Sequence, residues 1–531
     1  MPVVVPDSPN ARPAGFAITP RDARAKAEAQ QAVVEARRED PALRVKVIAP
    51  QYFGDNRYEV VYLEGRRAVV DVHVDGVTGR LLEVWTGPQA DTLLARGYEP
   101  SVARSLNEWY IWLPLAMLFV APFVDLRRPR RLLHLDLAVM LVFGASQYFF
   151  NRGQIDVSVP IATAALAYLL VRLLLAGLRP RAPRGPLVPM LPFWALVVGL
   201  VLLVGFRVTL NAVDSHVIDV GYASVFGADR ILHGEDLYER GGDLDDTYGP
   251  VTYLAYAPFE ALFPSDGPNG YLSAARAAAV TFDLLVIVGL VLLGSRLRRG
   301  RAGVRLGVAL AYAWAAYPFS LYALQTNTND ALVGALVLFA FVAMGSPPVR
   351  GFLLGLAGAA KFAPLALAPL LLSGTQRAGR AAAVSAAVAA ATVSVAVLAN
   401  LPDGGLREFY DATLGYQLTR ESPFSLWGLH PSLGWVQALV KIGTVLIALL
   451  VAVAPRERDL RQLAALGAAV LIGVQLSASY WFYLYIAWFA PLAFAALMGA
   501  HEDRHTVGSA ERGSPAGEAS SPKRARTVLG M

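Results

Sequence analysis

The sequence predicts a mainly α-helical, polytopic membrane protein with about 11–13 transmembrane helices and a small α+β domain at its N-terminus. Apolar runs of roughly 18–24 residues recur along the chain, and an α-helix of that length crosses a hydrocarbon core of roughly 30 Å. Hydrophobic residues make up 55% of the 531 residues and charged residues only 17%. The mean hydropathy is +0.45. This composition excludes a soluble enzyme of this size.

The N-terminal region has the pattern of a small soluble domain. Residues 1–20 lack the basic start and sustained apolar core of a secretory signal, so they are expected to be a flexible lead-in. Residues 21–40 have a helical composition, and 58–65 and 67–76 alternate apolar and polar residues as strands do. A turn and a third strand are expected within 77–87. We therefore predict a helix-plus-antiparallel-sheet domain over residues 21–105.

Eleven apolar segments are expected to cross the membrane as single helices. Three of them form an accessory group over residues 106–187, and the rest belong to a module over residues 188–500. Residues 501–531 are rich in Ser, Gly, Ala and charge, and are expected to be a disordered cytoplasmic tail. The expected crossings are 108–125, 132–150, 157–178, 188–208, 271–294, 305–323, 329–345, 379–400, 433–454, 462–478 and 481–499.

The loops between these segments predict the orientation. Arginine clusters mark cytoplasmic loops, and they occur at 126–131, 178–184, 295–305, 375–380 and 455–461. The loops 264–270, 324–330 and 477–480 carry no Lys or Arg and are expected outside. The sequence thus predicts a multi-pass protein of the cytoplasmic (plasma) membrane, with the N-terminal domain and the long 209–250 and 401–432 loops outside.

Two further apolar segments do not fit as simple crossings. Residues 350–373 have Lys361 and Pro364 near the middle and arginine at both flanks. Two half-helices that enter from the cytoplasm, turn near Lys361 and return would satisfy the charge rule, and such broken helices line enclosed cavities. The same reasoning makes 251–263 a short helix that dips into the membrane.

The 209–250 loop is strongly acidic, and Asp214 and Asp219 are its first carboxylates. A carboxylate at the membrane–water boundary can accept a proton from a hydroxyl that attacks an activated carbon. A solvated acidic loop is the alternative interpretation, and a surface position is the alternative for His216.

Three short motifs then follow in order. They are the Asp-Ser-His-Val element beginning at Asp214, the Gly-Glu-Asp-Leu-Tyr element beginning at Gly234, and Tyr248-Gly249-Pro250 before an apolar stretch. Their order over residues 188–500 resembles glycosyltransferase family 87 of the GT-C superfamily. Gly249 replaces one proline of the expected pair. The element from Val74 to Val84 resembles PepSY-type domains, which are non-catalytic exported modules.

The resemblance implies a GT-C-type fold and a polyprenyl-phosphate-mannose-dependent mannosyltransferase. Its donor would be a sugar linked to polyprenyl phosphate, used on the non-cytoplasmic face, and the acceptor a hydroxyl of a glycan or glycolipid. By position, Asp214 would be the general base, with Asp219 second. His216 and Tyr248 would contact substrate. The protein mainly has to orient the reactants and stabilise the phosphate charge.

Lys361 is one of only five lysines in the chain, and a lysine at membrane depth is costly unless it is functional. Two roles are open for Lys361: a contact with the lipid phosphate and a structural ion pair. The Lys-x-x-Pro pattern, which the sequence shares with the family it resembles, supports the first. Arg276 could bind substrate or extend to the interface, and the deeper Asp283 could pair with another helix. The side chains of Asn327 and Asp330 could bind sugar hydroxyls or cap a helix. Arg420 and His430 could cover the acceptor site or pack as ordinary loop.

No His/Asp/Glu cluster with metal-ligand spacing occurs along the sequence, so no metal or other cofactor is expected. The net charge of +6 comes mostly from arginines in short loops, which is typical of membrane topology and not of nucleic-acid binding. Membrane lipid is an expected partner. The alternatives to an enzyme are a transporter or flippase of lipid-linked saccharide, and a membrane sensor whose outer domain binds a ligand.

Overall fold

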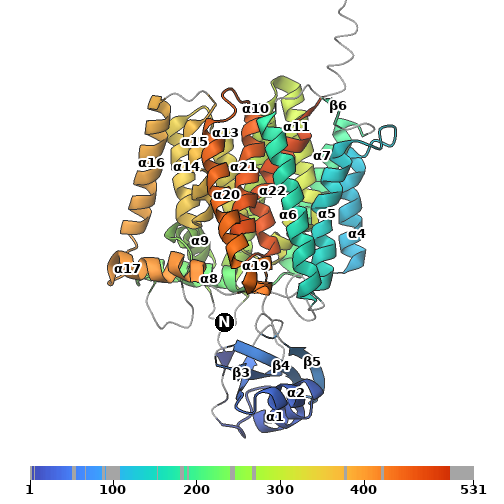
Figure 1. The fold of residues 1–531 in the computed structure, drawn as a ribbon, viewed down its shortest axis with the longest axis vertical. Helices are drawn as coiled ribbons and strands as arrows, with labels where there is room; N and C mark the ends of the chain where they lie inside the picture. The colour runs from blue at the N-terminus through green and yellow to red at the C-terminus, as the bar shows by residue number, and fades with distance from the viewer. Residues whose placement is uncertain are drawn as a thin grey trace, which may run out of the picture.

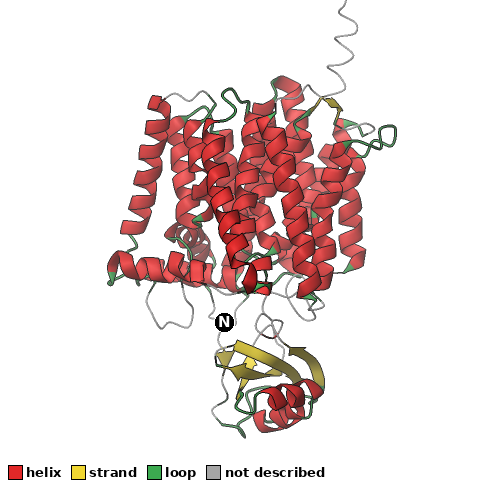
Figure 2. Cartoon of the chain, in the orientation of Figure 1, coloured by secondary structure: helices red, strands yellow, loops and turns green. Residues whose placement is uncertain are grey.

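The structure is a computed structural model that describes residues 3–4, 6, 8–50, 56–65, 67–86, 90, 108–151, 154–179, 184–187, 191–238, 246–265, 271–375, 379–419, 422 and 424–502. Figure 1 shows a small N-terminal unit below a large bundle of helices. In Figure 2 the strands are concentrated in that unit, and the bundle is almost entirely helical. The predicted fold class, mainly α with a small α+β domain, is confirmed.

The N-terminal unit is an antiparallel sheet with strands in the order β1-β2-β3-β4-β5, packed against two helices. The helix expected at 21–40 is divided into two. The strand β2 was not expected, although its sequence, RVKVIAP, alternates apolar and polar residues at its start. The elements are β1 Val3–Val4, α1 Pro20–Glu28, α2 Gln31–Glu39, β2 Arg44–Pro50, β3 Arg57–Glu64, β4 Arg67–Asp75 and β5 Leu81–Thr86.

Alternation along β3 and β4 gives this sheet two different faces, because successive side chains point to opposite sides of a strand. One face forms the apolar core with α1 and α2, and its members include Tyr58, Val60, Tyr62, Val70, Val72 and Val74. The intervening positions hold polar side chains, among them Glu59, Asp71 and His73.

The bundle contains the remaining helices. They are α4 Trp109–Val120 with η2 Ala121–Phe123, α5 Leu132–Phe150, α6 Ile155–Leu178, α7 Phe193–Val213, α8 Asp219–His233, α9 Pro250–Leu262, α10 Ser273–Leu297, α11 Gly300–Ala316, α12 Pro318–Gln325, α13 Asp330–Val342, α14 Pro347–Ala360, η3 Ala363–Leu367, α15 Ala368–Ser373, α16 Gly379–Leu398, α17 Gly405–Tyr410, η4 Asp411–Gly415, α18 Tyr416–Thr419, α19 Leu426–Leu429, η5 Pro431–Leu433, α20 Gly434–Val453, α21 Leu460–Ser477, η6 Tyr483–Tyr485 and α22 Ile486–Met498. Two short strands, β6 Arg184–Pro186 and β7 His501–Glu502, pair in parallel.

Seven helices of the described chain are long and apolar enough to cross a membrane, and α11 with α12, bent by 61°, makes an eighth. Four shorter apolar helices accompany them, at Trp109–Phe123, Asp330–Val342, Ala363–Ser373 and Tyr483–Met498. Each of the expected crossings overlaps one of these helices. The protein is therefore a multi-pass membrane protein.

Hydrogen bonds join several arginine-rich loops at one end of the bundle, called here the arginine face. Arg131 donates to the carbonyl of Pro186 at 2.8 Å and lies 2.7 Å from Nδ1 of His501. Arg298 donates to the carbonyl of Gly499. Figure 1 shows α8, α17 and α19 at the opposite end, on the side where the N-terminal unit lies. We call that end the α8 face.

The helices α14 and α15 form a hairpin with both ends at the arginine face. Arg350, in the first turn of α14, lies against Gly374, which directly follows α15. Arg458 also donates to the Gly374 carbonyl, at 2.9 Å. The chain reverses between Ala360 and η3, so Lys361 lies at the tip. The structure therefore has the break at Lys361 that the sequence predicts.

Several charged side chains inside the bundle are paired between helices, because an isolated charge in an apolar interior is costly. Arg207 of α7 binds Asp283 of α10 with an Nη2–Oδ1 distance of 2.5 Å, and Trp314 donates to the same carboxylate at 2.8 Å. Asp136 and Arg172 pair in the same way between α5 and α6, at 2.9 Å. Asp283 thus pairs with another helix, as the sequence analysis suggested.

Candidate active site

The helix α7 ends at Val213 and not at residue 208, where the sequence analysis ended it. Asp214 is therefore its C-cap residue. The extended segment 214–218 that follows runs beside the turn 325–330 between α12 and α13. The amide of His216 donates to the carbonyl of Gln325 at 3.1 Å. With its side-chain amide oriented to satisfy both ends, Gln325 donates to the carbonyl of Asp214 at 2.6 Å. The backbone of Asp214 is therefore held by this turn.

Asn327 is the central residue of that turn and is fully buried. Its φ of 52° lies in the left-handed region, which asparagine tolerates better than most residues. Its Nδ2 donates to the hydroxyl of Ser215 at 3.0 Å and to the carbonyl of His216 at 2.9 Å, while its Oδ1 accepts from Asn211 at 2.8 Å. The side-chain amide expected to meet sugar hydroxyls is thus bonded to the protein and positions the Asp214 segment.

Arg276, in the first turn of α10, holds the same segment from the other side. Its guanidinium donates to the hydroxyl of Ser215 at 3.0 Å and to the Ser215 carbonyl at 2.6 Å. It also lies 3.6 Å from the ring centroid of Tyr271, whose hydroxyl donates to the carbonyl of Ala212 at 2.6 Å. Arg276 therefore fixes the exit from α7, a role that was not among its two expected ones.

His216 and Asp219 differ in their surroundings. Burial lowers the pKa of His216, the charge of Arg276 lowers it further, and the nearby Asp214 carboxylate opposes both. The imidazole is consequently neutral near pH 7. Asp219 is the first residue of α8, is exposed, and accepts from the amide of Val220 at 2.9 Å. Asp214 itself is half-buried, and its carboxylate makes no hydrogen bond or ion pair with the described residues.

Lys361, at the hairpin tip, pairs with Asp330, the first residue of α13. The Nζ–Oδ1 distance is 2.7 Å, and Nε1 of Trp488 donates to the same oxygen at 2.8 Å. Lys361 is 8% exposed and Asp330 is 0% exposed. Oδ2 of Asp330 accepts no hydrogen bond from the described residues. The structure thus contains the ion pair that was one of the two roles expected for Lys361.

Three aromatic rings surround the lysine ammonium. Its Nζ lies 5.1 Å from the ring centroid of Tyr248, 5.3 Å from that of Trp488 and 5.8 Å from that of Tyr485. Rings at such distances attract a cation through their negative faces. Tyr248 comes from the loop before α9, and the other two come from the η6–α22 segment. The cation therefore stands where α9, α13, α14 and α22 converge.

The Tyr248-Gly249-Pro250 element is held against the hairpin tip. The amide of Gly249 donates to the carbonyl of Ala360 at 3.0 Å, and the hydroxyl of Thr252 donates to the same carbonyl at 2.9 Å. A Cβ on Gly249 would lie 2.1 Å from the Ala359 carbonyl oxygen. This contact gives a physical reason for glycine at the position where the family pattern has proline, since proline has no amide hydrogen to donate.

The predicted residues fall into two neighbouring groups joined by the turn 325–330. Asp214, His216, Arg276 and Asn327 belong to one group, and Tyr248, Asp330 and Lys361 to the other. His430 is exposed and follows α19, and it makes no contact with either group among the described residues. Arg420 lies outside the described residues. Sequence reasoning missed Gln325, Tyr485 as a ring facing the lysine, and the indole donor Trp488.

Comparison with known proteins gives one family. The model of glycosyltransferase family 87 matches residues 247–479, which is somewhat less than half of the chain. The matched segment contains Tyr248, Arg276, Asp330 and Lys361, whereas Asp214 precedes it. No curated protein matches the chain.

This match, together with the helices long enough to cross a membrane, supports a membrane glycosyltransferase. Residues 247–479 are similar to glycosyltransferase family 87, which supports the resemblance drawn from the sequence; of the three motifs, Tyr248-Gly249-Pro250 lies within the match.

Proposed function

We propose that the protein transfers a sugar from a polyprenyl-phosphate donor to an acceptor hydroxyl of a glycan or glycolipid at the α8 face, and that this face is non-cytoplasmic. Mannose is the sugar that the family resemblance favours. The observation that carries the proposal is the turn 325–330. It holds the backbone of Asp214 at one end and supplies Asp330, the partner of Lys361, at the other.

A general base needs a carboxylate that is accessible and held in place. Asp214 fits this role, because its backbone is fixed by Gln325 while its half-buried carboxylate makes no hydrogen bond with the described residues. Asp219 fits less well, since it is exposed at a helix start and accepts from Val220. We propose that Asp214 is the base that removes the proton of the acceptor hydroxyl. We also propose that the neutral His216 beside it contacts the sugar donor.

The leaving group in this reaction is a lipid phosphate, whose negative charge must be stabilised in the transition state. Lys361 lies at the tip of a hairpin between other helices and retains two ammonium hydrogens beyond the one donated to Asp330. The aromatic rings of Tyr248, Tyr485 and Trp488 keep the cation in place without neutralising it. We propose that Lys361 contacts the phosphate.

The test is sugar transfer by purified protein from a polyprenyl-phosphate-linked sugar to a lipid acceptor. Asp214→Asn keeps the size of the side chain and removes its basicity, so we expect transfer to fall by about 10²–10⁴-fold with donor binding nearly unchanged. Asp229→Asn is the matched control, because Asp229 is a carboxylate on α8 that pairs with the exposed His233.

Transfer that survives in Asp214→Asn would remove Asp214 from the role of base. Transfer lost in Asp219→Asn and retained in Asp214→Asn would assign the base to Asp219. A wild-type protein that moves a lipid-linked saccharide across vesicles, and transfers sugar from none, would contradict the enzymatic proposal itself.

A further inference from the structure

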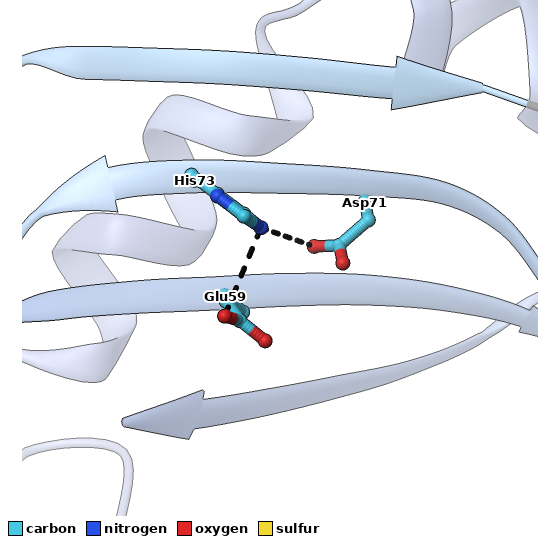
Figure 3. A group of neighbouring side chains, drawn as sticks. All are labelled: Glu59, Asp71 and His73. Atoms are coloured by element: carbon cyan, nitrogen blue, oxygen red, sulfur yellow. Dashed lines mark ion pairs between the residues drawn. The ribbon is translucent and has the colours of Figure 1, made fainter. Parts of the chain in front are cut away.

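The N-terminal unit contains a cluster of metal-ligating side chains far in sequence from the candidate active site. Glu59 of β3 is the direct cross-strand partner of His73 of β4, and Asp71 lies two residues before His73 on the same face. Figure 3 shows the three side chains converging between the two strands. One potential ligand atom from each lies within 4.8 Å of the others. Antiparallel register, and not spacing along the sequence, brings them together.

The distances within the cluster are too long for hydrogen bonds. Nε2 of His73 is 3.6 Å from Oδ1 of Asp71 and 3.8 Å from Oε1 of Glu59, whereas an N–H···O hydrogen bond spans about 2.7–3.2 Å. A zinc ion bound at about 2.0–2.1 Å places the ligand atoms of a tetrahedron roughly 3.4 Å apart. The two distances from Nε2 of His73 are within a few tenths of an ångström of that spacing, and the carboxylate oxygens of Asp71 and Glu59 lie within 4.8 Å of each other.

Burial makes the cluster hard to explain without a cation. His73 is 0% exposed and Asp71 is 2% exposed. Oδ1 of Asp71 accepts no hydrogen bond from the described residues, and among those residues it forms an ion pair with His73. A buried carboxylate oxygen without a donor is costly. Arg57 lies on the Glu59 side of the cluster, with its Nε 4.0 Å from Oε1 of Glu59. Its positive charge therefore offsets the Glu59 carboxylate before that of Asp71.

We propose that Glu59, Asp71 and His73 bind a divalent transition-metal ion, with zinc as the best match. One imidazole and two carboxylates are ligands that zinc accepts, and three protein ligands leave a fourth position for water or another ligand. The ion joins β3 to β4 and neutralises Asp71. The site adds a metal-binding function to a unit that lies outside the glycosyltransferase segment, and it is independent of the proposed sugar transfer.

The test uses the full-length protein in detergent after removal of metal by a chelator. Calorimetric titration with zinc is expected to show one ion bound per chain with micromolar or tighter affinity. Cobalt(II) is the second probe, because its visible absorption distinguishes four-coordinate from six-coordinate geometry. His73→Gln is expected to abolish binding. Glu59→Gln, at the more exposed edge of the cluster, is expected to weaken it about tenfold or more while the sheet remains folded.

The matched control is His233→Gln, which removes an exposed imidazole that also lies beside a carboxylate, at 3.1 Å from Asp229. It should bind zinc as the wild type does. Absence of zinc binding in the wild type would overturn the proposal and leave His73 as the internal partner of the two carboxylates. Zinc binding that is unchanged in both His73→Gln and Glu59→Gln would place the ion elsewhere and overturn it equally.

Discussion

The Asp330–Lys361 pair sits in surroundings where either charge alone would be expensive. Both side chains are buried, and removal of one member of a buried pair typically destabilises a protein by about 3–5 kcal/mol because the other charge remains unpaired. Removal of both members costs much less. This difference separates a structural role of the pair from a role of Lys361 in binding the donor phosphate.

We therefore expect Lys361→Met and Asp330→Asn each to lower the unfolding temperature in detergent, and the double variant to recover most of the loss. Sugar transfer should stay lost in the stable double variant, because the phosphate contact is absent. The matched control is the Asp136–Arg172 pair of α5 and α6. Its double variant Asp136→Asn/Arg172→Met should recover stability in the same way and keep transfer. Full transfer by the Lys361/Asp330 double variant would show that the pair is structural alone.

At the scale of elements, the contact between the α9 loop and the hairpin tip depends on a missing side chain. A Cβ on Gly249 would stand 2.1 Å from the Ala359 carbonyl oxygen. Gly249→Ala is expected to destabilise the protein by about 1–3 kcal/mol, measured as a lower unfolding temperature, and to displace Tyr248 from Lys361. Gly249→Pro should be worse, since it also removes the hydrogen bond to Ala360.

Gly205, within α7, is the control because, apart from the adjacent backbone of α7, no atom of the described residues lies within 4 Å of an added Cβ there. Gly205→Ala should leave stability unchanged or raise it by up to about 1 kcal/mol through helix propensity. Equal unfolding temperatures for Gly249→Ala and the wild type would mean that the loop and the tip are not in contact as described.

The helices themselves follow from hydropathy, which is why every expected crossing overlaps a helix. The break at Lys361 was also predictable, because a lysine and a proline interrupt an apolar run between arginines. The predicted end of α7 was five residues too early. Hydropathy falls after Arg207, so the apolar segment was ended at 208, whereas the helix continues to Val213. A charge paired inside the bundle, as Arg207 is with Asp283, does not end a helix.

Contacts between distant segments were less accessible to sequence reasoning. Nothing in the sequence near Lys361 indicates that Lys361 and Trp488 both donate to Asp330, since three separate helices must first pack together. The cluster in the N-terminal sheet was predictable only in part. Alternation places Asp71 and His73 on one face, but Glu59 joins them only through the register of β3 against β4.

At the scale of the whole molecule, the arginine face and the α8 face are opposite ends of the bundle, and the N-terminal unit lies on the α8 side (Figure 1). If the positive loops are cytoplasmic, the N-terminal unit must be outside. The chain contains no cysteine, so single introduced cysteines report position without background. Val77 in the N-terminal unit and Leu126 in an arginine-rich loop are 49% and 77% exposed.

We expect Val77→Cys to react with a membrane-impermeant maleimide in intact cells and Leu126→Cys to react only after the membrane is opened. Permeabilised cells provide the control, because both residues should then be labelled. The reverse pattern in intact cells would place the proposed sugar transfer on the cytoplasmic side.

The α14–α15 hairpin adds no net passage through the bilayer, because it enters and leaves through the arginine face. The hairpin therefore does not change the number of membrane crossings, and it is this number that sets the direction of each later helix. A hairpin of this kind can be lengthened, shortened or deleted while α16 to α22 keep their orientation, whereas one additional crossing helix at the same point would invert them all. The depth of the tip and the residue at position 361 can therefore change while every later loop stays on the same side of the membrane.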